Sequence, residues 1–82
     1  MTDGTLNSLV RLRDRAVRIL DSEATWETKY ELLFSEDLSL RVKAVDPSFS
    51  YYDPDTTYEA DSVAFVRALQ DRVAELEKAG LL

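Results

Sequence analysis

The sequence predicts an all-α fold: a small bundle of three to four helices with one aromatic-rich loop at about residues 46–56. Apolar residues recur at spacings of three and four along most of the chain, which is the period of an amphipathic helix. Only two glycines and two prolines interrupt the 82 residues. That length leaves room for one domain, so residues 1–82 are expected to form a single helical domain.

The first two helices are predicted from N-caps followed by apolar rows. Asp3, Thr5 and Asn7 are possible caps for a helix at about residues 6–20. Thr25 is a good cap for a second helix. Its apolar face holds four residues at helical spacing: Trp26, Tyr30, Leu33 and Phe34.

Residues 38–45 fit two patterns. Leu38, Val42 and Val45 lie at helical spacing, whereas Leu38, Leu40 and Val42 also alternate with polar residues as a strand does. We prefer a helix that is broken or kinked near Ser35, and a strand is the alternative.

The last helix is the most strongly marked, at about residues 57–79. Thr56 with Glu59 predicts a capping box at its start, and Gly80 predicts its C-terminal end. Before it, Asp46-Pro47 and Asp53-Pro54 bound an irregular segment, because a residue that precedes proline is disfavoured in helix.

Composition argues against most enzyme classes. The chain has no cysteine and no histidine, which excludes thiol nucleophiles, imidazole proton shuttles and the commonest metal ligands. Glycine occurs only at positions 4 and 80, so a glycine-rich phosphate loop is excluded. The acidic run 53–61 fails the EF-hand pattern and is better explained as helix capping. We therefore predict a protein that is not an enzyme, with no cofactor and no metal.

Charge favours a basic protein as the partner. The net charge is −6, and the first twenty residues carry four arginines against two aspartates, so the rest of the chain is strongly acidic. This balance disfavours nucleic-acid binding and favours steering toward basic surfaces. The sequence shows no signal peptide and no apolar run that would span a membrane, so a cytoplasmic location in a bacterial host is expected.

The aromatic-rich loop provides the main candidate binding site. Tyr51, Tyr52, Asp53 and Asp55 combine large rings with acidic flanks, a composition that suits a binding hot spot for a basic groove. Whether Phe49 and the tyrosines point inward as a plug or outward as a contact is open at this stage. An acidic edge on the second helix is expected to add electrostatic steering: Glu23, Glu27 and Glu31.

Two further surfaces support alternative functions. Arg11, Arg15 and Arg18 form a basic stripe, which we interpret first as a solvated edge partly neutralised by Asp14. One alternative is that in an oligomer the stripe holds a small anionic nucleotide and makes the protein a sponge for such a signal. Another is an electrostatic seam between subunits, with the basic first helix against the acidic second. A 3-4-3 row in the last helix either packs within the chain, which we prefer, or forms a homo-oligomer seam of a structural or assembly component: Val66, Leu69, Val73 and Leu76.

Two stretches resemble small uncharacterised acidic proteins of tailed bacteriophages and prophages: Thr25-Trp26-Glu27-Thr28-Lys29-Tyr30-Glu31-Leu32-Leu33-Phe34-Ser35 and Tyr51-Tyr52-Asp53-Pro54-Asp55-Thr56-Thr57-Tyr58-Glu59-Ala60-Asp61. The resemblance carries no characterised activity and assigns no residue a role. It implies a context, in which small acidic phage proteins often inhibit host machinery, anti-CRISPR and other anti-defence proteins among them. The function expected is stoichiometric inhibition of a host protein.

Overall fold

A computed structural model describes residues 2–79 of the chain, with side chains from residue 6 onward. Within these residues it contains four α-helices and no strand. This confirms the all-α class and the helical interpretation of residues 38–45, and the strand alternative is wrong. The helices are α1 (Thr2–Asp21), α2 (Trp26–Leu33), α3 (Ser39–Val45) and α4 (Tyr58–Lys78).

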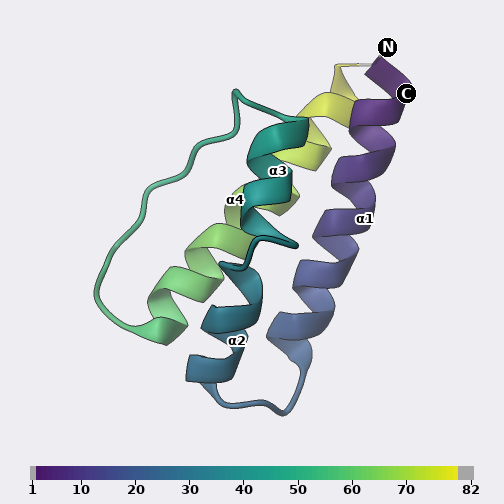
Figure 1. Ribbon diagram of the computed structural model, residues 1–82. Helices are drawn as coiled ribbons and strands as arrows, with labels where there is room; N and C mark the ends of the chain where they lie inside the picture. The colour runs from purple at the N-terminus through teal and green to yellow at the C-terminus, as the bar shows by residue number, and fades with distance from the viewer. Residues whose placement is uncertain (1, 80–82) are drawn as a thin grey trace.

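The two long helices, α1 and α4, pack against each other and are covered by the two short ones (Figure 1). The α2 helix contacts both α1 and α4, whereas α3 lies against α1. The segment between α3 and α4 swings away from the bundle and returns to the start of α4 (Figure 1). No helix described over residues 2–79 is long and apolar enough to cross a membrane.

The hydrophobic core draws on all four helices and on the loop residue Phe49. It contains the buried apolar side chains of α1 and most of the 3-4-3 row of α4. Burial of apolar side chains stabilises the fold by about 25 cal/mol per Å². The buried members are Leu6, Leu9, Leu12, Ala16, Leu33, Leu38, Val42, Phe49, Phe65, Val66, Leu69 and Val73.

The 3-4-3 row of α4 lies inside the molecule. Val66, Leu69 and Val73 are at most 1% exposed, and Leu76 packs partly buried against the same core. The preferred interpretation, packing within the chain, is therefore confirmed. Val66, Leu69 and Val73 are therefore unavailable to a homo-oligomer seam, whereas Leu76 keeps part of its surface.

The helix starts agree with the predictions at α2 but not at α1 or α4. Thr25 caps α2 by accepting a hydrogen bond from the Thr28 amide at 3.2 Å. The cap of α4 is Thr57, which accepts from the Ala60 amide at 3.0 Å, so the Thr56–Glu59 capping box is wrong by one residue. The predicted stop at Gly80 lies outside the described residues.

The start predicted for the first helix is four residues late. The helix begins at Thr2, so the polar residues interpreted as its caps lie within its first turns. A backbone that is already helical from residue 2 has no need of a side-chain cap at position 3, 5 or 7.

Candidate functional site

The segment from Asp46 to Thr57 carries the predicted binding residues and is fixed to the bundle at its first half. Phe49 is 3% exposed and meets Phe65 edge-on, with ring centroids 5.9 Å apart. Tyr51 is half-buried and also packs edge-on against Phe65, at 5.5 Å. Tyr52, in contrast, is 84% exposed. The loop thus packs into the core at Phe49 and Tyr51 and presents the Tyr52 ring to solvent.

Burial and nearby charge keep the Tyr51 hydroxyl protonated. Burial, followed by the negative charges of Asp53 and Asp61, raises the pKa of Tyr51 from 10.0 to about 12. Tyr51 therefore presents a neutral hydroxyl over the whole physiological pH range. Its ring packs in the aromatic cluster that includes Phe34 and Phe49, which leaves less of it exposed than of Tyr52.

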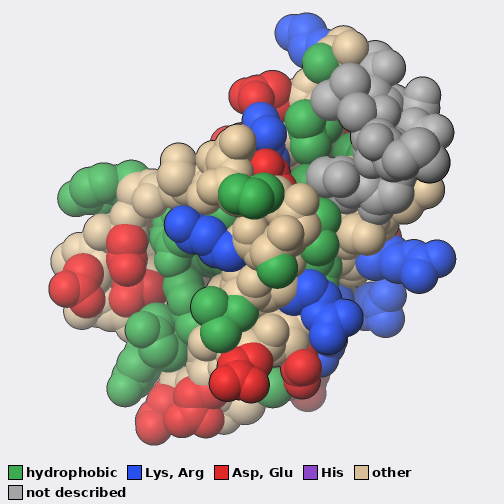
Figure 2. Space-filling view, turned by 45° about the horizontal axis from the view of Figure 1, so that its top comes forward, with side chains coloured by type: hydrophobic (Ala, Val, Ile, Leu, Met, Phe, Trp, Pro, Cys, Tyr) green, Lys and Arg blue, Asp and Glu red, His purple; other side chains and the backbone are tan. Residues whose placement is uncertain are grey.

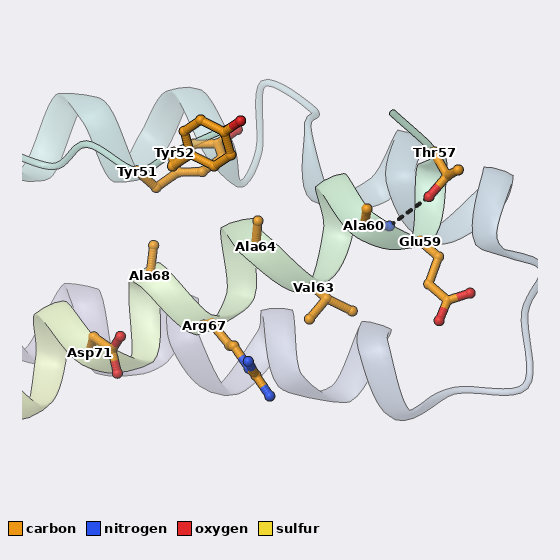
Figure 3. A pocket seen from close by; sticks show the side chains of 10 residues that line it. All are labelled: Tyr51, Tyr52, Thr57, Glu59, Ala60, Val63, Ala64, Arg67, Ala68 and Asp71. Atoms are coloured by element: carbon orange, nitrogen blue, oxygen red, sulfur yellow. Dashed lines mark hydrogen bonds between the residues drawn. The ribbon is translucent and has the colours of Figure 1, made fainter. Parts of the chain in front are cut away.

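An open groove of about 700 Å³ runs between this loop and the outer face of α4 (Figure 3). In Figure 3 the two tyrosines lie across from Ala64 and Ala68, so small side chains form the floor beneath large rings. Polar and charged residues complete the lining of the groove. The full lining is Tyr51, Tyr52, Thr57, Glu59, Ala60, Val63, Ala64, Arg67, Ala68 and Asp71.

The two loop aspartates shape the approach to α4. Asp53 accepts a hydrogen bond from the Asp55 amide at 3.0 Å, and Asp55 has a positive φ of 50°. Aspartate tolerates this left-handed conformation better than most residues other than glycine. Both carboxylates are exposed, as predicted for a contact surface.

A second, smaller pocket of about 410 Å³ lies at the start of α4. Sequence reasoning missed it, because Tyr30 was assigned to a core face and Asp61 to helix capping. The fold brings these two residues together with Tyr58 across the contact of α2 with α4. Its lining is Tyr30, Asp55, Thr56, Thr57, Tyr58 and Asp61.

The predicted acidic edge is exposed but stands apart from both hollows. Glu23, Glu27 and Glu31 all face solvent, and none of them lines the groove or the smaller pocket. On the face shown in Figure 2, acidic side chains lie along the left and lower margins beside exposed hydrophobic ones, and basic side chains gather on the right.

The three arginines of the stripe are exposed and do not converge on one site. Arg11 lines a hollow with Arg41, whereas Arg18 lines a different one with Arg13. Arg15 lines neither. Asp14 pairs with its neighbour Arg13 at 2.9 Å and with none of the three stripe arginines. Within one chain the stripe thus forms no closed anion site.

Two buried polar atoms accept or donate no hydrogen bond among the described residues: Asp61 Oδ1 and Ser62 Oγ. Asp61 is only 7% exposed and Ser62 is fully buried. The described part of the chain contains no group of three or more acidic side chains placed to hold a metal ion. The acidic run at 53–61 is thus divided between an exposed loop and one buried carboxylate.

Comparison of the chain with protein-family models, with curated proteins and with solved structures gives no match. The function is therefore argued from the geometry of the groove and the pocket.

Proposed function

We propose that this protein is a non-enzymatic interaction protein that inhibits a host protein by stoichiometric binding. The observation that carries the proposal is the groove between α4 and the loop, with an apolar floor, charged ends and the 84% exposed ring of Tyr52 on its lip. Exposed tyrosines beside an apolar groove are typical of binding hot spots. Nothing in the packing of the bundle requires Tyr52 to be a large aromatic residue.

Charge supports a partner with a basic surface. The chain has a net charge of −6, and Asp53, Asp55 and Glu59 are all exposed on or beside the groove. An acidic surface of this kind accelerates association with a basic partner and disfavours nucleic acid. Glu27 and Glu31 on α2, with Glu23 in the turn before it, add to the same field.

The resemblance of two stretches to phage proteins supplies the biological context of the proposal. Both stretches contribute to the surfaces described above: the first contains Tyr30, and the second contains Tyr51, Tyr52 and Asp61. An anti-defence role, in which the partner is a component of a bacterial defence system, is the form of inhibition that this context favours.

Native mass spectrometry of the protein purified gently from bacterial lysate tests the proposal. We expect a complex of defined stoichiometry that Ala64→Arg abolishes, because the new side chain fills the groove floor. The matched control is Ala74→Arg, the same change at an exposed position of the same helix. Loss of the complex in both variants, or in neither, would contradict binding in the groove.

A further inference from the structure

The pocket at the start of α4 combines two aromatic rings with two carboxylates. The rings of Tyr30 and Tyr58 lie 5.0 Å apart and are tilted by 52°, and Tyr58 is 48% exposed. Asp55 and Asp61 line the same pocket, and no lysine or arginine does. Aromatic faces and carboxylates both attract organic cations.

Asp61 is the feature that calls for a ligand. Its side chain lines the pocket, yet the residue is only 7% exposed and Oδ1 receives no hydrogen bond from the described residues. A buried carboxylate with an oxygen that lacks a donor is costly, and a cation bound beside the part of this residue that lines the pocket would lower that cost. The exposed Asp55 lines the same pocket and adds a second negative charge.

The electrostatic potential in the pocket favours a cation, although the pocket lies at the positive N-terminus of α4. The N-terminus of α4 carries roughly half a positive charge. The two carboxylates of the pocket outweigh it, and Glu59 in the first turn adds to them. Burial and, after it, the negative charges of Asp53 and Asp61 raise the pKa of the neighbouring Tyr51.

We propose that this pocket binds the guanidinium group of an arginine side chain presented by the protein partner. A planar guanidinium stacks on a tyrosine face and donates hydrogen bonds in a fork that matches a carboxylate. A lysine ammonium lacks both the plane and the fork. A metal ion is disfavoured because the described residues offer it no cluster of three acidic groups.

This inference rests on the proposed function for the source of the arginine but not for the chemistry of the pocket. The pocket lies at the start of α4, whereas the groove extends along that helix as far as Asp71. An arginine from a partner seated in the groove would therefore anchor one end of the interface. The two sites share Thr57 in their linings, so a single partner can occupy both.

The test is a titration of the whole 82-residue protein with N-acetyl-arginine N-methylamide, followed by two-dimensional amide NMR. We expect saturable shifts centred on residues 55–61, with a dissociation constant in the millimolar range. The N-acetyl-citrulline analogue, which has the same shape without the charge, should give none. Equal shifts with both compounds, or no saturation with either, would overturn the proposal.

Variants separate the pocket from the overall charge. Asp61→Asn should weaken arginine binding by about tenfold, the scale of one lost charge-assisted hydrogen bond. Asp37→Asn, at an exposed position outside the pocket, should leave it unchanged. Tyr58→Ala removes an exposed ring and provides a second test if Asp61→Asn impairs folding. A lysine analogue that binds as tightly as arginine would overturn the guanidinium assignment.

The groove variant distinguishes this proposal from the proposed function. Ala64→Arg is expected to abolish the complex with the partner and to retain binding of the arginine probe. Probe binding without any protein complex would leave the pocket standing and remove the proposed function. A protein complex without probe binding would support the proposed function and overturn the arginine pocket.

Discussion

Arg72 donates a hydrogen bond from Nε to Asp46 Oδ2 at 2.6 Å, which ties the second half of α4 to the residue where α3 ends. A second bond from Nη2 reaches Asp46 Oδ1 at 3.3 Å, so the pair is bidentate. Asp46 is buried, and the bond to its carboxylate raises the pKa of Arg72 further. The same carboxylate accepts a hydrogen bond from the Ser48 amide, which fixes the first residues of the loop.

Replacing this aspartate should destabilise the protein and loosen the loop. Asp46→Ala leaves Arg72 without its buried partner, and we expect a loss of about 3 kcal/mol in the free energy of unfolding. Urea denaturation measures it. Glu75→Ala removes only the exposed partner of Arg72 and should cost less than about 1 kcal/mol. Equal losses in the two variants would show that the Asp46 pair has no special weight.

Lys29 is predicted to stabilise the junction of α1 and α2. Its Nζ donates to the Leu20 carbonyl at 2.7 Å, at the end of α1, and lies 4.2 Å from the centre of the Trp26 ring. A cation at a helix C-terminus and over an indole is favourable on both counts. Lys29→Met keeps the aliphatic packing and should lower the unfolding free energy by about 1–2 kcal/mol. The exposed Lys43→Met serves as control, and a similar loss there would contradict the assignment.

Ser62→Ala is predicted to stabilise the protein. The Ser62 hydroxyl is fully buried and has no hydrogen-bond partner among the described residues, and alanine is the better helix former. We expect a gain of about 1 kcal/mol, measured by thermal or urea unfolding. Ser39→Ala, which removes a hydroxyl bonded to the Ser35 carbonyl, should give no such gain. A destabilised Ser62→Ala would mean that the hydroxyl is satisfied after all.

Tyr51 should titrate above the ordinary pKa of tyrosine. Its pKa rises from 10.0 to about 12 in the folded protein, because burial and two nearby carboxylates oppose the phenolate. The neutral form is therefore favoured by folding, and the stability it contributes is present below pH 10 and lost as the pH rises from 10 to 12.

Ultraviolet absorbance of tyrosinate measures this titration directly. The intact protein should show one late step that Tyr51→Phe removes. Tyr52→Phe, a change at an exposed ring, should leave the late step in place. A single common transition for all four tyrosines near their ordinary pKa would contradict the prediction.

The helices could be predicted from short-range sequence patterns. The 3-4 spacing of apolar residues specifies an amphipathic helix, and Asp-Pro pairs specify breaks, so the four helices and the loop at 46–56 could be predicted. The exact start of α4 could not be predicted, because the neighbouring residues Thr56 and Thr57 can both cap a helix. Only the backbone extension at Thr57 selects one of them.

The candidate site was predicted in part. Asp53, Asp55 and Tyr52 are exposed, as a contact surface requires, whereas the Tyr51 ring is half-buried against the core. The pocket of Tyr30, Tyr58 and Asp61 had no signal in the sequence, because its members belong to helices about thirty residues apart and each has an ordinary local explanation.

The sequence by itself determined which segments are helical, how the charge is distributed and which chemistries are excluded, because these depend on residue type and short-range spacing. Only the tertiary structure decided which aromatic side chains are buried, which arginines lie together and where a carboxylate is left without a donor. Those properties depend on how α2 and the loop pack against α4, and helix packing is set by contacts between residues far apart in the chain.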